Sequence, residues 1–398
     1  MASKPGSLPL EGITVIELST VVTAALGVTL LCEQGARGIK VEPPGIGDPL
    51  RYLGTASAGV SALFANCNRG KESIALDLKQ AEGVAVVREL AARADVLISN
   101  YRPGVLDRLG LGYDTLRAAN PGLVYLSISG FGTEGPLASA PAYDHVIQAM
   151  SGFAAVQGRD GKLDLVRTFV CDEVTAYTAC QAATAALFQR ERTGEGQRID
   201  LSMLDAALYF LWPAGMSEHT FTGDGVVERS ELKNTYRAFP TRDGFFAMAP
   251  FTDHHWHGLF RATGNGDLCE DPRYATIGAR ATALDELFDR FEAAFAAMAT
   301  AEVEALLREL DIPGGRCLAL EETIAHPQLA ATGSVQAQTH PVLGPLRSPA
   351  HPARFGGQRL PPRSPLGALG EHTDAVLGEL GYDAAAIAAL REKGVAAG

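Results

Sequence analysis

The chain has 398 residues, 46% of them hydrophobic and 20% charged, which is typical of a globular protein long enough for two domains. Its net charge of −12 argues against nucleic acid or an anionic membrane as the partner. The beginning, MASKPGSLPLEG, has no apolar signal segment, and no uncharged apolar run reaches about 18 residues. We therefore expect a cytoplasmic protein without a membrane span. The six cysteines form no CxxC pair, so we expect reduced and mostly buried thiols.

Strands and helices alternate along the first third of the chain. Helical patterns such as AEGVAVVRELAARA separate short β-rich runs, which predict strands at 12–19, 38–44, 73–78, 94–100 and 122–132. This alternation predicts a mainly parallel sheet covered by helices, and such sheets bind ligands at the carboxyl ends of their strands. The first strand is not followed by G-x-G-x-x-G, and G-x-x-x-x-G-K-[ST] is absent. A nicotinamide or P-loop nucleotide assignment therefore lacks its fingerprint.

A helix rich in small residues is predicted at 172–190, followed by the strand QRIDLS and a further helix from about Leu204. From about residue 220 the character of the sequence changes. There TYRAFPTRDGFFAMAP predicts a hairpin with Asp243 and Gly244 at its turn, with helices after it. A tract rich in proline and glycine (341–369) then leads to a pair of C-terminal helices.

Asp172, at the beginning of the 172–190 helix, permits two interpretations. Asp is a preferred helix N-cap, where its side chain only accepts backbone N–H bonds. It is also ionised at neutral pH, with a usual pKa of about 3.9, and the positive end of a helix stabilises the anion, as a nucleophile requires. The neighbouring Glu173 is interpreted as a first-turn charge that complements the helix dipole.

Eight stretches, in order from near residue 10 to about 395, resemble the family III CoA-transferases, which include the α-methylacyl-CoA racemases. They are GITVIEL, GIKVEPPGIGDPLR, NRGKESIALDLK, ADVLISNYRPGVLDRLGLGYDTL, NPGLVYLSISGFGTEGP, YDHVIQAMSG, RTGEGQRIDLSMLDA and LGEHTDAVLGELGY. The resemblance implies an α/β fold with a Rossmann-like large domain built from both chain ends around a parallel sheet. It also implies a smaller α+β middle domain and an interlocked homodimer. We therefore expect a large CoA-binding domain at 1–219 and a small domain at 220–325. Residues 326–398 would form a linker and C-terminal helices that return to the large domain.

The resemblance also implies a reaction. Transferases of this family use an Asp at the start of the helix that follows the YD…QAMSG segment, and Asp172 matches it. The implied substrates are an acyl-CoA and a carboxylic acid. The implied intermediates are an aspartyl mixed anhydride and an aspartyl-CoA thioester, each reached through an oxyanion that needs N–H donors. Tyr143 and Asp144 of the YD segment are expected to support the site.

Racemases of this family carry a His on the YD segment as a second acid/base, and this chain has Tyr143 there. Tyrosine, with a pKa near 10, is a poor proton acceptor at neutral pH. His145 lies two residues further, on a different side of a helix from position 143. The resemblance therefore favours a transferase, and the alternative is a racemase that uses Asp172 and His145. Two roles stay open for Tyr143. It would hydrogen-bond a substrate oxygen, or it would be a half-buried side chain that only packs against its neighbours.

The motifs also match contacts that the family makes with CoA, at predicted strand ends or just beyond them. The matching residues are Val22, Thr23, Leu76, Asp77, Lys79, Asn100, Tyr101, Arg102 and Arg108. Among them, Arg108 and Lys79 are the best phosphate ligands, since Arg offers a fixed donor fork and Lys a mobile charge.

Two departures from the family pattern concern the ligand. Many members place an Arg after the VE of the second strand, at the adenosine end of CoA, where this chain has Pro43. Lys40 or Arg51 would have to replace it. Formyl-CoA transferases place a Gln where Val22 stands, so we expect a more apolar acyl group here than formyl or oxalyl.

Three histidines, His254, His255 and His257, surround a Trp in TDHHWHGLF, which invites a metal-site interpretation. Carboxylate partners are not evident and the stretch matches a packing helix of the family, so we expect no metal. A third hypothesis, of another class, is a CoA-binding protein without turnover.

Overall fold

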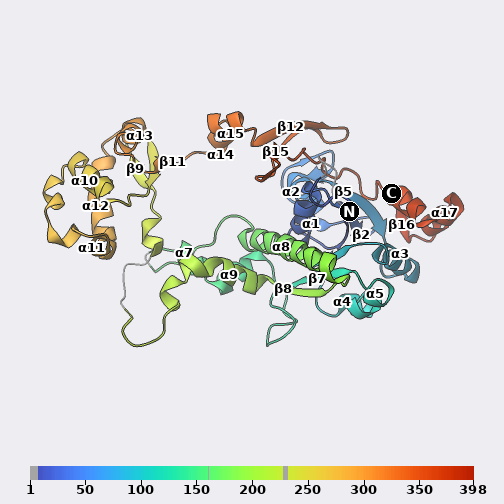
Figure 1. The fold of residues 1–398 in the computed structure, drawn as a ribbon. Coiled ribbons are helices and arrows are strands. Elements are labelled where there is room, and N and C mark those ends of the chain that lie inside the picture. The colour runs from blue at the N-terminus through green and yellow to red at the C-terminus, as the bar shows by residue number, and fades with distance from the viewer. Residues whose placement is uncertain (1–7, 160, 227–231) are drawn as a thin grey trace. The chain divides into compact units, whose positions relative to one another are not determined.

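The computed structural model of the chain describes residues 8–159, 161–226 and 232–398. The chain divides into two compact units, one formed by Met1–Phe210 with Ala330–Gly398 and the other by Leu211–Leu329. Both ends of the chain thus belong to the first unit, and the predicted middle domain, 220–325, lies within the second (Figure 1).

A seven-stranded sheet organises the first unit, in the order β16-β5-β2-β1-β6-β7-β8. All neighbouring pairs are parallel except β16 with β5. The mainly parallel α/β sheet expected from the sequence is therefore confirmed. Its strands are β1 (Thr14–Leu18), β2 (Arg37–Glu42), β5 (Lys71–Leu76), β6 (Val96–Ser99), β7 (Val124–Ser129), β8 (Arg198–Ser202) and β16 (Ala396–Ala397).

Helices cover both faces of this sheet (Figure 1). Two small sheets each pair a two-residue strand with another: β3 (Ala56–Ser57) with β4 (Val60–Ser61), and β14 (Arg354–Phe355) with β15 (Gln358–Arg359). The helices of the first unit are α1 (Thr23–Glu33), α2 (Ala62–Cys67), α3 (Ala81–Ala91), α4 (Val105–Arg108), α5 (Tyr113–Ala119), α6 (Asp144–Ser151), α7 (Phe153–Gln157), α8 (Val170–Thr193), α16 (Thr373–Leu380) and α17 (Ala384–Glu392). Helices α9 (Met203–Gly215) and α15 (Pro327–Thr332) lie where the two units join along the chain.

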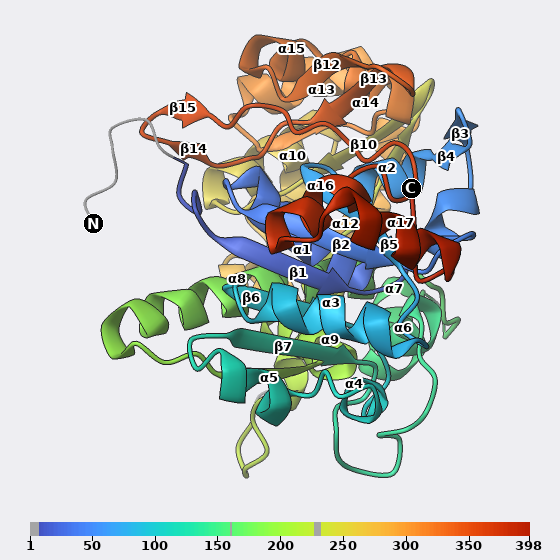
Figure 2. The ribbon, with the colours of Figure 1, turned by 90° about the vertical axis from the view of Figure 1, so that its right-hand side faces the viewer.

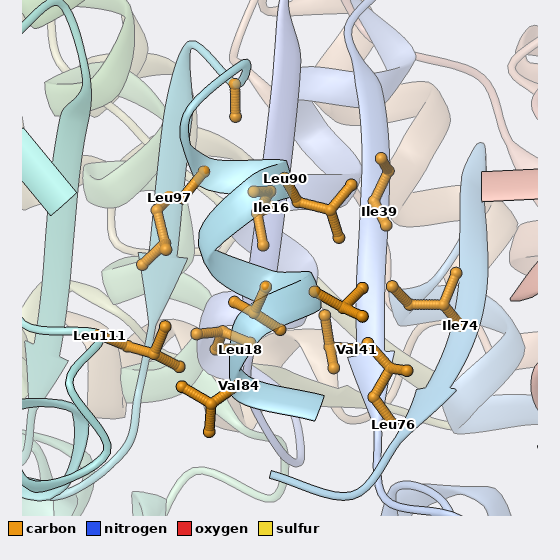
Figure 3. Packing of buried hydrophobic residues seen from close by; sticks show 14 of the residues in the cluster. Ile16, Leu18, Ile39, Val41, Ile74, Leu76, Val84, Leu90, Leu97 and Leu111 are labelled. Carbon is orange, nitrogen blue, oxygen red and sulfur yellow. The ribbon is translucent and has the colours of Figure 1, made fainter. Parts of the chain in front are cut away.

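The two faces of the sheet differ in chemistry because side chains alternate along each strand. On one face, Ile16, Ile39 and Ile74 pack against Val84 and Leu90 of α3 (Figure 3). Figure 2 shows α3 and α16 in front of the strands on this face. On the other face, Glu17 of β1 lies beside Lys40 of β2 in the strand register, and both side chains are fully buried.

Helices α1 and α8 pack side by side and in the same direction. A methyl group at Gly27 of α1 would lie 3.3 Å from the carbonyl oxygen of Ala176 in α8 and 3.5 Å from Ala179 Cβ. Two turns later, Gln34 Nε2 lies 3.5 Å from Cys180 Sγ. The missing side chain at position 27 therefore permits the close approach, and it brings the beginnings of both helices together.

The second unit contains the predicted hairpin, formed by β9 (Phe239–Thr241) and β10 (Gly244–Met248). Strand β11 (Gly314–Arg316) completes its three-stranded sheet. An aromatic core forms between this sheet and the helices, including Trp256, Phe288 and Phe295. The helices are α10 (Asp253–Ala262), α11 (Ile277–Thr282), α12 (Leu284–Phe295), α13 (Thr300–Glu309) and α14 (Leu320–Ile324).

The C-terminal part of the first unit contains an element that the sequence did not predict. Strands β12 (Val335–His340) and β13 (Gly344–Pro349) form an antiparallel hairpin before and within the proline- and glycine-rich tract. The helix pair α16 and α17 was predicted, and it is confirmed. Within the described part of the chain, no helix has both the length and the apolar composition needed to cross a membrane.

The six thiols are free. Four are buried, as expected, and the exceptions are Cys269, which is half-buried, and Cys317, which is exposed.

Candidate active site

A cavity of about 410 Å³ opens at the carboxyl ends of β1, β6 and β7 in the first unit. The strand order reverses between β1 and β6, and such switch points are where open α/β sheets bind ligands. The cavity is lined by Thr20, Val21, Thr23, Asn100, Tyr101, Arg102, Pro103, Val105, Ile128, Ser129, Gly130, Ala138, Ala140, Pro141, Ala142, Tyr143, Asp172 and Met203. Its wall is mainly apolar, and Arg102 and Asp172 are its formally charged residues.

Asp172 is the third residue of α8 and only 6% exposed. The N-cap of α8 is Phe169, so the interpretation of Asp172 as an N-cap is wrong. Its side chain instead lines the cavity, where the Thr23 hydroxyl donates a hydrogen bond to Oδ1. Among the residues that the structure describes, no group donates a hydrogen bond to Oδ2.

Asp144, the first residue of α6, provides the cap that α8 lacks. Its Oδ1 accepts the backbone N–H groups of Cys171 and Asp172, at 2.7 and 3.2 Å. Its Oδ2 accepts a hydrogen bond of 2.6 Å from Gln148 Nε2, and Gln148 Oε1 in turn accepts the N–H of Val166. The Asp144 side chain therefore supports the cavity through the backbone of α8, and it is almost completely buried.

Burial raises the pKa of Asp172 to about 6, against the opposing effect of the Thr23 hydrogen bond. The carboxylates of Asp144 and Glu173 raise this pKa further. The sequence predicted a fully ionised carboxylate stabilised by the helix dipole, but the loss of water outweighs that stabilisation. At pH 7 a group with a pKa of about 6 is still about 90% ionised, and it is more basic than an exposed Asp.

The turn between β1 and α1 forms one wall of the cavity, and it is held from two sides. Asn100, at the end of β6, accepts the Thr20 N–H at 3.0 Å and donates to the Thr20 carbonyl at 2.7 Å. The next residue, Val21, has φ +66°, a conformation that is unfavourable for a β-branched side chain. Its N–H donates to Asp48 Oδ1 at 3.1 Å, which helps to hold this strained turn.

Asp48 belongs to a buried network of charges behind the turn. Lys40 Nζ lies 2.9 Å from Asp48 and 2.6 Å from Glu17, and Lys71 Nζ lies 2.6 Å from the other oxygen of Glu17. Burial alone would raise the pKa of Glu17, but the two lysines lower it to about 2. These residues therefore form a structural support of oppositely charged groups, whose side chains are all fully buried.

Lys40 and Arg51 were the expected replacements for an arginine at position 43. Lys40 is enclosed in the charge network, and Arg51 binds both oxygens of Glu42 at 2.8 Å and the carbonyl of Gly367 at 2.9 Å. Neither side chain reaches the surface, so this expectation is wrong for both residues. Pro43 itself is exposed.

Five of the predicted site residues line the cavity together with Asp172: Thr23, Asn100, Tyr101, Arg102 and Tyr143. Asp144 lies behind it, as described above. Val22 packs in an apolar cluster with Leu50 and Phe64, and the residue that lines the cavity is Val21. The inference from Val22 to the acyl group therefore has no basis in the structure.

Four other predicted residues lie outside the cavity lining. Leu76 is buried in the core, and Asp77 accepts the backbone N–H of Lys79 just after β5. Lys79 and Arg108 are exposed.

His145 is exposed and does not line the cavity. Its ring makes an edge contact with Phe169, the residue before α8, at 6.5 Å between centroids. Tyr143 lines the cavity and is 67% exposed, so it is not the half-buried packing residue of the alternative interpretation.

In the second unit, His255 Nδ1 accepts the backbone N–H groups of Phe251 and Thr252 at the start of α10. No group of three potential metal ligands occurs among the described residues.

Thr20, Val21, Met203 and the apolar segment at 138–142 also belong to the wall, although the sequence did not indicate them. The only available signal was their position just after predicted strands. For 138–142 even that signal was weak, because eight residues separate it from β7.

The chain is similar to known proteins along most of its length. The family model described as CoA-transferase family III matches residues 10–373. Acetyl-CoA:oxalate CoA-transferase of Acetobacter aceti is 36% identical over 362 residues, which are 90% of this chain and 92% of the relative. Succinyl-CoA:glutarate CoA-transferase of Mus musculus is 33% identical over 396 residues, 97% of this chain and 90% of the relative. The crystal structure of a CAIB/BAIF family protein from Brucella suis has 32% identity and a TM-score of 0.80, covering 94% of this chain and 100% of that one.

Proposed function

Since the chain belongs to CoA-transferase family III, we propose that it moves CoA from an acyl-CoA thioester to a carboxylic acid through covalent intermediates on Asp172. The observation that carries this proposal is the Asp172 carboxylate. It is buried in the wall of the strand-end cavity, has a pKa near 6, and leaves Oδ2 without a hydrogen bond from any described residue. Such a group is ionised at neutral pH and free to attack.

In the first half of the reaction, Oδ2 attacks the acyl carbonyl, the carbon–sulfur bond breaks, and the sulfur leaves as the CoA thiolate. The product is a mixed anhydride of Asp172 and the acyl group. The thiolate then attacks Cγ of Asp172, and the donor acid leaves with Oδ2. The aspartyl-CoA thioester that remains reacts with a second carboxylate by the same steps in reverse, which returns an oxygen atom to Asp172.

For CoA itself we propose the cavity as the site of the thioester end, next to Asp172. Asn100, Tyr101 and Arg102 would contact the pantetheine arm, because they line the cavity at the end of β6. The exposed side chains of Arg108 and Lys79 are the proposed phosphate ligands, since both are cations, Lys79 three residues after β5 and Arg108 at the end of α4.

A homodimer remains part of the proposal. The first unit exposes large apolar side chains on its helices, including Phe188 of α8, and Tyr209 and Phe210 of α9, at 66%, 82% and 59%. Exposed apolar groups of this size often mark an interface. Light scattering coupled to size exclusion would give the mass of the assembly. The cytoplasmic location stays a prediction.

Covalent trapping tests the proposed mechanism. The enzyme is incubated with a panel of acyl-CoA donors and borohydride or hydroxylamine, and residue 172 is examined by mass spectrometry. We expect a modification at Asp172 and loss of transfer in Asp172→Ala. The matched control is Glu173→Gln, which changes the neighbouring carboxylate outside the cavity and should retain transfer. An unmodified Asp172 together with an active Asp172→Ala variant would disprove the mechanism.

The same acyl-CoA panel separates the alternatives. A racemase would incorporate deuterium at Cα from D₂O without any acceptor acid, and we expect no such exchange because His145 is outside the cavity. A CoA-binding protein without turnover would bind the thioesters but show neither transfer nor exchange.

A further inference from the structure

Thr23 was matched to the CoA contacts of the family, but its hydroxyl does something else in this structure. It is the first residue of α1 and 4% exposed, and its Oγ1–H donates to Oδ1 of Asp172. Hydroxyl and carboxylate come from two helices whose beginnings meet at the cavity, and both residues line it. This contact leaves the two oxygens of Asp172 in different environments.

The proposed reaction needs the two oxygens to behave differently. The oxygen that attacks becomes the bridge of the anhydride and later leaves with the donor acid. The other oxygen stays on Cγ throughout, and it carries the negative charge each time Cγ is attacked. Oδ1 already accepts the Thr23 hydrogen bond, and no described residue donates to Oδ2. Oδ2 is therefore the attacking oxygen and Oδ1 the one that becomes the oxyanion.

We propose that the Thr23 hydroxyl is the oxyanion donor for attack on the aspartyl carbonyl. When the CoA sulfur forms its bond to Cγ, the π electrons of the Cγ–Oδ1 bond move to Oδ1, where Thr23 Oγ1–H stabilises the negative charge. The intermediate collapses when the Cγ–Oδ1 double bond re-forms and Oδ2 leaves with the donor acid as its carboxylate. Attack by the acceptor carboxylate on the thioester passes through an oxyanion at the same place. This inference rests on the proposed function, and it assigns Thr23 a role in only some of the steps.

The surroundings of Thr23 hold its hydroxyl in place before the reaction. The strained turn that precedes it is fixed by Asn100 and Asp48, and Asp48 is itself anchored by Lys40. On the other side, Gly27 lets α1 pack closely on α8. A donor that is already oriented stabilises developing charge without reorganisation, which is the basis of oxyanion holes.

The test separates acylation from thioester formation. Wild type and the Thr23→Val variant are mixed with acyl-CoA in the absence of acceptor acid, quenched rapidly in acid, and analysed by intact-protein mass spectrometry. Enzyme carrying the acyl group is the anhydride, and enzyme carrying CoA is the thioester. We expect acylation within a few-fold of wild type, and thioester formation about 10²-fold slower, the usual effect of losing one oxyanion donor. Free CoA thiol should then appear as the stalled anhydride is hydrolysed.

Two variants make the result specific. Thr23→Ser keeps the hydroxyl and should restore thioester formation to within a few-fold of wild type. Thr175→Val removes a buried hydroxyl of α8 that donates to the Cys171 carbonyl and does not line the cavity, and it should leave both steps unchanged. Equal thioester formation in Thr23→Val and wild type, with Asp172 still modified, would overturn this inference but not the proposed function. No modification of Asp172 in any variant would overturn both.

Discussion

Asp144 Oδ1 accepts the backbone N–H groups of Cys171 and Asp172, so a side chain of α6 completes the first turn of α8. The position of the candidate nucleophile therefore depends on a second carboxylate that does not line the cavity. The carboxylates of Asp144 and Asp172 therefore have separate tasks. Asp172 lines the cavity, and Asp144 holds the backbone of α8 behind it.

Replacement of Asp144 by Ala should lower both stability and activity. Two buried N–H groups would lose a charged acceptor, which we expect to cost about 2–4 kcal/mol of the free energy of unfolding. The first turn of α8 should also loosen, so we expect kcat to fall at least about 10-fold with a smaller change in KM. The control is Asp243→Ala in the second unit, where Asp243 accepts the Thr300 N–H at 2.7 Å. It should lower stability but not the activity of the folded fraction.

The activity should depend on an ionisable group with a pKa near 6. The attacking form of Asp172 is the carboxylate, and burial raises its pKa to about 6, so kcat/KM should fall as the pH drops below this value. The 3′-phosphate of CoA titrates in the same range, with a second pKa of about 6. Profiles measured with an acyl-dephospho-CoA remove that contribution. In Thr23→Val the same limb should move to higher pH, because the hydrogen bond from Thr23 lowers this pKa.

The Asp172→Asn variant should be inactive and yet more stable than wild type at neutral pH. The folded carboxyl group holds its proton more tightly than the unfolded chain does. Wild-type stability therefore falls as the pH rises from about 4 to about 6, by roughly 2–3 kcal/mol. The amide has no charge to desolvate and escapes this loss. Denaturant unfolding at pH 4 and pH 7.5 checks the prediction: the two proteins should differ little at pH 4, and an equal difference at both pH values would contradict it.

Gly27→Val should separate α1 from α8. A side chain at this position meets the Ala176 carbonyl oxygen at 3.3 Å, so we expect overpacking to cost about 1–3 kcal/mol and the Thr23 contact to weaken. Gly378, in α16, has open space where a Cβ would stand and supplies the control variant Gly378→Val. The melting temperature and the rate of thioester formation should both fall in Gly27→Val, and neither should fall in the control.

The Lys40→Met substitution should lower the free energy of unfolding, because it leaves two buried carboxylates, Glu17 and Asp48, without a shared cation. Loss of one partner of a buried ion pair typically costs about 3–5 kcal/mol. Lys79→Met, at an exposed cation, should leave stability unchanged and raise KM for acyl-CoA. A stable Lys40→Met variant with raised KM would show that Lys40 acts on the ligand after all.

Local patterns predicted six of the seven strands of the large sheet and missed only the two-residue strand β16. They left two interpretations open for Asp172, and the resemblance to the family favoured the nucleophile. The sequence was not sufficient for Lys40 and Arg51, whose charge indicates a surface role until their carboxylate partners are known. The sequence also could not distinguish Val21 from Val22. These neighbours lie in different surroundings, Val22 in the apolar cluster and Val21 in the cavity wall. The contact of Thr23 with Asp172 joins two helices through the packing at Gly27, and no local pattern contains it.

Thr23 and Asp172 are 149 residues apart in the chain. In the folded chain they meet through the packing of α1 on α8, two helices that belong to distant parts of the sequence. Catalytic competence should consequently arise late in refolding, after most secondary structure has formed, which would make the regain of transferase activity a reporter of completed tertiary assembly.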